Sequence, residues 1–186
     1  GLEGRVGRHI GRPALDLIDD HIPDVFVLEL SSFQLETTSS LRPRSATILN
    51  LSADHMDRYD DFGSYANAKK RILTNAETAV INVDDSNLAQ LNIDDGVQKI
   101  SFSLSCPTSD QEYGIRSDGS HEWIMRGSQK IVRTDLLSMN GRHNILNALA
   151  AIGLVESSGY PVSDRMIKAL TEFRGFPHRG EQVLSK

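Results

Sequence analysis

The chain has 186 residues, of which 39% are hydrophobic, and it carries a net charge of -5. This length and apolar content suffice for one well-buried core, and the negative charge without a basic cluster argues against a nucleic-acid or membrane-surface partner. No apolar stretch approaches the roughly 18 to 20 residues that cross a bilayer, and the single Cys106 excludes an internal disulfide, so we expect a soluble, cytoplasmic protein. The Gly- and Arg-rich start without an initiating Met suggests a chain cut from something longer.

Strands and helices alternate in the first half of the chain. Residues 1–12 are expected to be a loop, and Pro13 favours a short helix over residues 14–19. The apolar run at 25–30 predicts a strand covered on both faces, followed by a turn or a single helical turn over 31–38. Further strands are expected at 45–51 and 78–83, and helices at 62–76 and 86–91. This alternation predicts an α/β fold with a mainly parallel sheet flanked by helices.

The pattern changes after residue 98. Short extended segments, at 99–103, 113–116, 122–126 and 130–133, are separated by residues typical of hairpin turns. They predict a small antiparallel β appendage on the same core. Helices at about 142–157 and 163–171 and a loop-like tail at 173–181 complete the chain.

Two of the expected strands run out into polar residues. Glu29 ends the first apolar run and His55 follows the second. Because ligands of open α/β sheets bind beyond the carboxyl ends of the strands, the two endings predict one shared site. Either residue alone could simply tie a loop. Together, carboxylate and imidazole suit a divalent cation such as Mg²⁺ or Mn²⁺ that carries phosphate oxygens.

Lys69 falls on the apolar stripe of the helix expected at 62–76. Phe62, Tyr65, Lys69, Ile72 and Ala76 follow one another at spacings of three and four, which is one face of an α-helix. A lysine there must lay its stem along the surface, pair with a carboxylate or be chemically altered, because burying a bare ammonium is costly. It can ligate a metal only after conversion to a carbamate.

Asn144 and Asn147 stand three residues apart in the first turns of the helix at 142–157, so they share a face. Their amides can donate and accept, as recognition of a purine edge requires, and a helix N-terminus favours a nearby anion. The alternative is that they cap the helix and cover a solvated face.

Six segments of the chain resemble, in the same order, the motifs of the Mur ligase family. They are residues 28–36 (LELSSFQLE), 54–59 (DHMDRY), 68–69 (AK), 82–85 (NVDD), 141–150 (GRHNILNALA) and 176–179 (FPHR). The first two are most similar to the members that add D-glutamate to a peptidoglycan precursor. The resemblance covers the family's central ATP-binding domain, at residues 1–181, with 182–186 as the start of a linker to an absent C-terminal domain.

The resemblance implies ATP-dependent amide ligation through an acyl phosphate, with UDP-N-acetylmuramoyl-L-alanine and D-glutamate as substrates of the full enzyme. By motif, Glu29, His55 and a carbamylated Lys69 would be the catalytic and metal-binding residues. Asn144, Asn147, His178 and Arg179 would contact the nucleotide. Ser31 and Phe33 would lie beside the precursor or the metal, and His9 would lie beside the precursor.

The chain also departs from the family. Arg8 and His9 replace Gly and Asn in the segment at 7–11, which resembles a loop that contacts the muramoyl-alanine portion. The phosphate-binding loop G-x-x-x-x-G-K-[ST] is missing. We therefore expect the 186-residue chain alone to be inactive.

Two alternatives remain open. The first is another amide ligase of this fold, either a different Mur ligase or a folylpolyglutamate synthetase, although the SSFQ and HMDRY segments argue against it. The second is a non-catalytic nucleotide-binding module.

Overall fold

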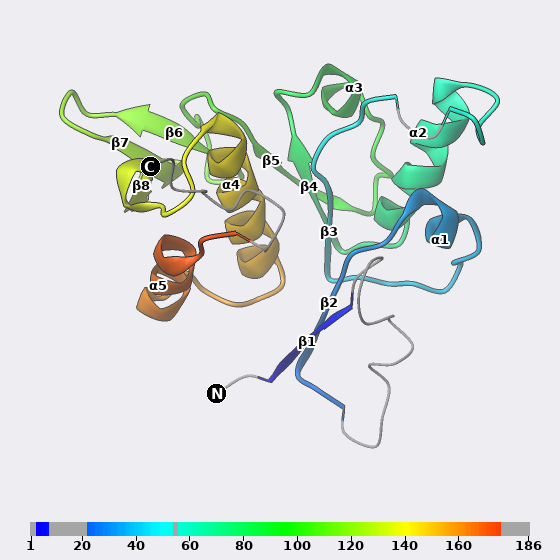
Figure 1. Ribbon diagram of the computed structural model, residues 1–186, viewed down its shortest axis with the longest axis horizontal. Coiled ribbons are helices and arrows are strands. Elements are labelled where there is room, and N and C mark those ends of the chain that lie inside the picture. The colour runs from blue at the N-terminus through cyan, green and yellow to red at the C-terminus, as the bar shows by residue number, and fades with distance from the viewer. Residues whose placement is uncertain (1–2, 8–21, 54–55, 176–186) are drawn as a thin grey trace, which may run out of the picture. The chain divides into compact units, whose positions relative to one another are not determined.

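The structure, a computed structural model, describes residues 3–7, 22–53 and 56–175. The chain divides into two compact units (Figure 1). The smaller comprises Gly1–Leu41 and Ala53–Arg71, and the larger comprises Arg42–Ser52 and Ile72–Lys186. The helix expected at 14–19 lies outside the described residues.

The smaller unit contains a two-stranded parallel sheet and two helices. Strand β1 (Gly4–Gly7) pairs with β2 (Val25–Leu28), in a register that runs from Gly4 opposite Val25 to Gly7 opposite Leu28. The prediction of a loop over residues 1–12 is therefore wrong at β1. Gly-Arg-Val-Gly carries little strand propensity, and it is the pairing with β2 that holds it extended.

The strand β2 is not covered on both faces, contrary to the sequence-based expectation. Val6 and Val27 are direct partners across the sheet, and they are 50% and 54% exposed. Side chains that are partners across a pair point to the same face, so one face of this sheet presents apolar side chains. The apolar run of β2 predicted the strand correctly but not its burial.

The two helices of the smaller unit begin at polar caps. Helix α1 (Ser32–Glu36) confirms the expected single helical turn and starts with a capping box between Ser31 and Gln34. Helix α2 (Phe62–Lys70) starts at Asp61, whose carboxylate accepts from the amide of Ser64 at 2.7 Å. It is shorter than predicted, because the chain tightens into a 3₁₀ turn at Arg71–Leu73.

The larger unit is built on a six-stranded sheet in the order β3-β4-β5-β6-β7-β8. The strands are β3 (Ser45–Ile48), β4 (Thr78–Asn82), β5 (Gln98–Phe102), β6 (Glu112–Ser117), β7 (Glu122–Arg126) and β8 (Gln129–Arg133). Strands β3 to β6 run parallel, whereas β7 and β8 are antiparallel.

The expected mainly parallel sheet is confirmed, but the antiparallel appendage starts later than predicted. The sequence pattern places the segments of β5 and β6 in the appendage, whereas both strands extend the parallel part of the sheet. Their short extended segments resemble hairpin strands, but the segment between them, 103–111, joins two strands that pair in parallel. The antiparallel pairs, and with them the hairpin turns, lie on either side of β7.

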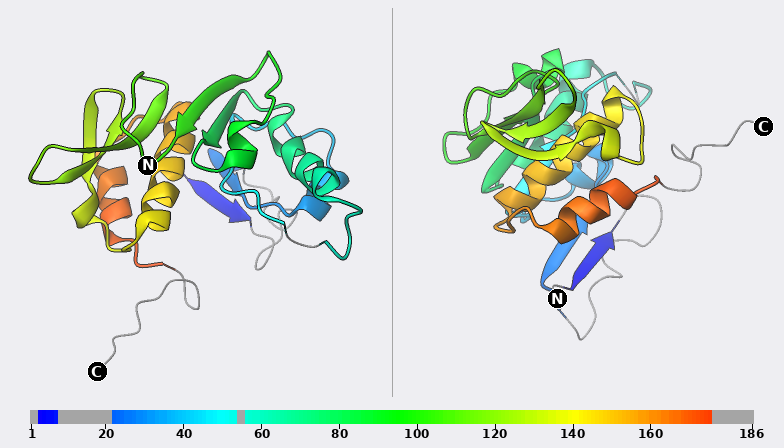
Figure 2. Two further views of the ribbon diagram at one scale, coloured as in Figure 1. Left: turned by 90° about the horizontal axis from the view of Figure 1, so that it is seen from above. Right: turned by 90° about the vertical axis from the view of Figure 1, so that its left-hand side faces the viewer.

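The helices of the larger unit are α3 (Ser86–Ala89), α4 (Arg142–Ser157) and α5 (Asp164–Glu172), with a further 3₁₀ turn at Thr134–Leu136. The expectations for α4 and α5 are confirmed within one residue. Helix α5 lies beside α4 (Figure 2), and its Met166, Ile167 and Leu170 pack against the core.

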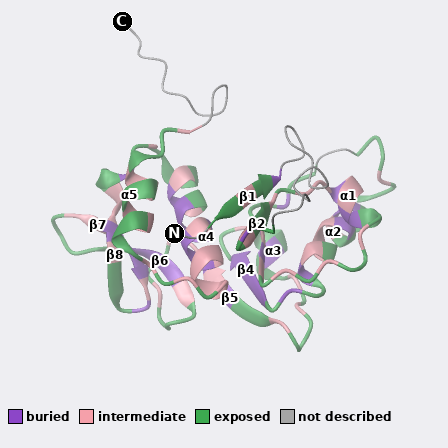
Figure 3. Ribbon diagram, turned by 90° about the horizontal axis from the view of Figure 1, so that it is seen from below, coloured by how far each residue is buried: buried purple, intermediate pink, exposed green. Residues whose placement is uncertain are grey.

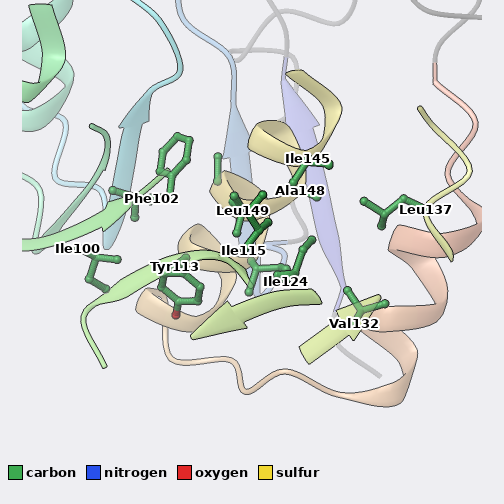
Figure 4. Packing of buried hydrophobic residues seen from close by; sticks show 13 residues of the cluster. Ile100, Phe102, Tyr113, Ile115, Ile124, Val132, Leu137, Ile145, Ala148 and Leu149 are labelled. Atoms are coloured by element: carbon green, nitrogen blue, oxygen red, sulfur yellow. The ribbon is translucent and has the colours of Figure 1, made fainter. Parts of the chain in front are cut away.

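The core of the larger unit lies between α4 and the sheet. All five residues of β4 are buried (Figure 3), and Ile145, Ala148 and Leu149 of α4 pack among side chains of β5 to β8 (Figure 4). Burial of a large aliphatic side chain stabilises a fold by about 1.5–3 kcal/mol, so this cluster dominates the stability of the unit. Helix α4 also contacts β3 and β4.

Two contacts fix the direction of α4. The hydroxyls of Ser45, the first residue of β3, and Ser157, the last residue of α4, are 2.6 Å apart. Arg44 donates to the carbonyl oxygen of Ser158 at 3.4 Å. Helix α4 therefore runs antiparallel to β3, so its amino end lies toward the carboxyl ends of the parallel strands.

Candidate functional site

At the carboxyl ends of β3 and β4, polar side chains brace the loops. Asn82 donates to the carbonyl oxygen of Leu49 at 3.0 Å. Asp85 accepts from the amide of Leu51 at 2.8 Å, and its other oxygen caps α3 by accepting from Asn87 and Leu88. The segment that leaves β3 is thus fixed by side chains from the end of β4.

The amino end of α4 lies toward this same edge. Its N-cap, Gly141, has a φ of 102° and no side chain to cap the helix, so the first amides have no capping side chain. Asn144 donates to the carbonyl oxygen of Asn140 at 2.7 Å, and Asn147 lies exposed one turn on, 3.4 Å from Asn144. Asn144 therefore has a structural partner, whereas the face of Asn147 is open to solvent.

A cavity of about 350 Å³ opens at the carboxyl ends of β4 and β5. Its lining includes Asp84, Ser103, Ser105 and Cys106. Asp84 accepts from the amide of Leu104 at 2.7 Å, so its carboxylate also braces a loop.

A second cavity, of about 400 Å³, lies at the opposite edge, by the start of β5 and the end of α4. There Glu156 accepts from the hydroxyl of Tyr113 at 2.6 Å and pairs with Arg126 at 3.0 Å. Burial, followed by the hydrogen bond to Glu156, raises the pKa of Tyr113. Because the Glu156 carboxylate already joins α4 to β6 and β7, this cluster has a structural role.

In the smaller unit, the expected site residues surround α1. Glu29 follows β2, and its amide continues the pairing by donating to the carbonyl oxygen of Gly7 at 2.9 Å, while its side chain is exposed. The hydroxyl of Ser31 accepts from the amide of Gln34 at 3.3 Å. Phe33 is half-buried, with the guanidinium carbon of Arg58 4.4 Å from its ring centre.

Lys69 is half-buried on α2, as its place on the apolar stripe predicted. Its ammonium nitrogen lies 5.0 Å from the centre of the Tyr65 ring, one turn earlier on the helix. A cation at this distance over an aromatic face is attracted by the ring quadrupole. The side chain is thus partly shielded from solvent, and its ammonium group has an aromatic partner.

Sequence reasoning missed the aromatic cluster formed by Phe33, Tyr59, Phe62 and Tyr65. Tyr59 stacks on Phe33 with ring centres 6.1 Å apart, and meets Tyr65 edge-on at 5.4 Å. Burial, followed by the interaction of the hydroxyl with the neighbouring Glu36 carboxylate, raises the pKa of Tyr59. The spacing of Tyr65 and Lys69, four residues apart, was the signal available.

The donor chemistry of the expected metal ligands fits Mg²⁺ or Mn²⁺. Glu29 offers an exposed carboxylate, and Lys69 would offer a carbamate oxygen; both are hard ligands. Within residues 3–7, 22–53 and 56–175, no three His, Cys, Asp or Glu side chains lie together as a metal site. His9, His55, His178 and Arg179 lie outside the described residues, so the convergence of Glu29, His55 and Lys69 stays a prediction.

A parallel sheet with polar side chains at its carboxyl edge and an uncapped helix terminus near them is characteristic of nucleotide-binding α/β domains. The family described as "Mur ligase middle domain" matches residues 7–155. The chain therefore belongs to the Mur ligase family, as its motifs predicted.

The curated relatives match this chain over nearly its whole length. The chain is 45% identical to the UDP-N-acetylmuramoylalanine--D-glutamate ligase of Methylobacillus flagellatus over 98% of the chain, and 43% identical to the ligase of the same name from Nitrosococcus oceani over 97%. It spans about 40% of the first relative's length and 39% of the second's.

Among solved structures, a UDP-N-acetylmuramoyl-L-alanyl-D-glutamate--2,6-diaminopimelate ligase is similar to this chain with a TM-score of 0.62 and 26% identity. The match covers 83% of this chain and 34% of that one. The described part of this chain has no helix of the length and apolarity that a membrane crossing requires.

Proposed function

We propose that this chain is the ATP-binding part of a ligase that joins D-glutamate to UDP-N-acetylmuramoyl-L-alanine, with residues 1–181 forming its central domain. The observation that carries the proposal is the 45% and 43% identity, over nearly the whole chain, to relatives that bear the name of this activity. Because those relatives are longer, the complete reaction belongs to the full-length protein, and the 186-residue chain alone would be inactive.

The reaction joins a carboxylate to an amine. The γ-phosphoryl group of ATP passes to the terminal carboxylate of the precursor, which gives an acyl phosphate and ADP. The amine of D-glutamate then attacks the acyl carbon, phosphate leaves, and an amide and a proton are formed. Such chemistry depends on positioning and on stabilisation of phosphate charge.

Glu29, His55 and a carbamylated Lys69 would hold Mg²⁺, or Mn²⁺ in its place. Bound Mg²⁺ would neutralise charge on the phosphates. The exposed position of Glu29 directly after β2 and the contact of Lys69 with the Tyr65 ring support these assignments.

Asn144 and Asn147 would contact adenine, and His178 and Arg179 would approach the nucleotide. The uncapped amino end of α4 and the exposed position of Asn147 support the first part of this assignment. Ser31, Phe33 and His9 would lie beside the precursor.

A ligation assay on the full-length protein tests the proposal. The protein is given ATP, Mg²⁺, UDP-N-acetylmuramoyl-L-alanine and a panel of amino acids that includes D-glutamate, L-glutamate and meso-diaminopimelate. We expect amide formation and release of ADP and phosphate with D-glutamate alone. Efficient use of another amino acid, with none of D-glutamate, would reject the named activity while leaving the ligase class intact.

A further inference from the structure

We propose that Tyr65 is a positioning residue for Lys69, whose side chain it holds against the face of its ring. The ammonium nitrogen lies 5.0 Å from the ring centre. Residues four apart on a helix lie on one face, so the stem of Lys69 extends back over the turn that carries Tyr65. The contact stands by itself, but its effect on metal binding rests on the function proposed above.

The ring of Tyr65 is fixed in place. It is only 2% exposed, Tyr59 meets it edge-on at an interplanar angle of 62°, and Phe62 is tilted against it with ring centres 6.3 Å apart. A ring packed in this way cannot turn away from Lys69 without moving its neighbours. The face of the ring beside Lys69 therefore has a fixed orientation.

The same cluster reaches α1. Tyr59 stacks on Phe33 with the two rings within 8° of parallel, and Arg58 lies over the Phe33 ring and 3.5 Å from Glu36. Ring contacts thus connect Lys69 to Phe33, a residue from a separate segment of the chain. The ring that Lys69 lies against is therefore held by tertiary packing as well as by its place on α2.

The contact with the Tyr65 ring restricts the Lys69 side chain, which favours its use as a metal ligand. A long, flexible lysine loses side-chain entropy when its end is held at one point, and a neighbouring group that already restricts the stem reduces this cost. The effect does not depend on whether the stem ends in an ammonium or in a carbamate. We therefore expect Tyr65 to act on metal affinity more than on the KM of either substrate.

The test begins with the unliganded, full-length protein labelled with ¹³C-lysine, in which Lys69→Arg assigns the Lys69 signal. We expect the ε-methylene of Lys69 to show an upfield ring-current shift that Lys70 lacks. Tyr65→Phe should keep this shift because the ring face is retained, and Tyr65→Leu should lose it. A wild-type Lys69 signal without the shift would overturn the contact, and this result requires no variant to fold.

The second measurement is the dissociation constant for Mn²⁺ in the same proteins. Tyr65→Leu should weaken Mn²⁺ binding by about tenfold, as loss of groups that orient metal ligands does. Tyr65→Phe should match the wild type, because it keeps the ring face that Lys69 lies against. Loss of the shift without loss of affinity would overturn the positioning role. If Lys69→Ala itself leaves Mn²⁺ affinity unchanged, the metal role of Lys69 fails while the contact result stands.

Discussion

The amide of Leu51 donates to Oδ2 of Asp85 at 2.8 Å, so a carboxylate at the end of β4 holds the segment that leaves β3. The other oxygen of Asp85 accepts from the amides of Asn87 and Leu88 at the start of α3. One side chain therefore fixes two loops at the carboxyl edge of the sheet, where the chemistry of α/β domains is placed.

Replacing Asp85 with Ala should lower the free energy of unfolding by about 1–3 kcal/mol, because three amides lose their acceptor. Hydrogen exchange at the amide of Leu51 should also become faster. Urea unfolding and amide exchange measure the two effects. Asp95→Ala, at an exposed position of the same unit, is the control and should be close to neutral; equal effects of the two substitutions would contradict the bracing role.

Gly153 lets α4 approach β4 closely. A Cβ at this position would lie 2.9 Å from Cγ1 of Val80, which is fully buried and cannot move without disturbing the core. Gly153→Ala should therefore destabilise the protein by about 1–3 kcal/mol, despite the better helix propensity of Ala. At Gly96 nothing lies within 4 Å of such a Cβ, so Gly96→Ala is the matched control. A stabilised Gly153→Ala variant in thermal unfolding would contradict this packing.

Ionisation of Tyr113 should lower the free energy of unfolding at alkaline pH. Burial and the bond to Glu156 raise its pKa above the ordinary value of 10.0 in the folded state. Because the pKa is raised on folding, the protonated phenol contributes fully to the free energy of unfolding below pH 10. This contribution decreases as the pH rises past 10, by about 1.4 kcal/mol for each pH unit.

Tyr113→Phe should cost about 1.5–3 kcal/mol at pH 8, because it removes a hydrogen bond to a carboxylate. The difference between wild type and variant should shrink between pH 10 and pH 11. Urea unfolding of both proteins at pH 8, 10 and 11 measures it. A difference that stays constant over this range would show that the phenol does not couple to folding.

Asn147 should act on nucleotide affinity rather than on stability, since its side chain is exposed. In the full-length protein, Asn147→Ala should raise the KM for ATP by about tenfold, the value of one or two hydrogen bonds, with kcat nearly unchanged. Asn92→Ala, another exposed asparagine of the larger unit, serves as the control. An unchanged KM would remove Asn147 from the adenine contacts.

Local sequence patterns predicted the helices that bury one face and the strands that are buried on both faces. The 3.6-residue period of α4 and the apolar run of β4 correspond directly to what each element buries. The strand β1 was missed because it is held by pairing with β2 rather than by its own residues. The direction of β5 and β6 was missed because short strands carry no signal of parallel or antiparallel pairing.

The sequence pointed to candidate site residues through their chemistry, but it gave no sign of the side chains that support them. Lys69 stood out because a charge interrupts an apolar stripe. Its ring partner did not, because an aromatic residue on such a stripe is ordinary core. The bracing by Asn82 and Asp85 joins segments more than 30 residues apart, which no local pattern encodes.

Lys69→Ala in the full-length protein tests the proposed chemistry most directly, with ATP-dependent ligation of D-glutamate measured with and without added acetate or formate. We expect a loss of about a hundredfold or more, because a metal ligand is removed, and partial recovery with the short acid, whose carboxylate can occupy the vacated position. Lys70→Ala, one residue along the same helix, should keep its activity. Full activity of Lys69→Ala without any added acid would contradict the role of Lys69 in holding the metal.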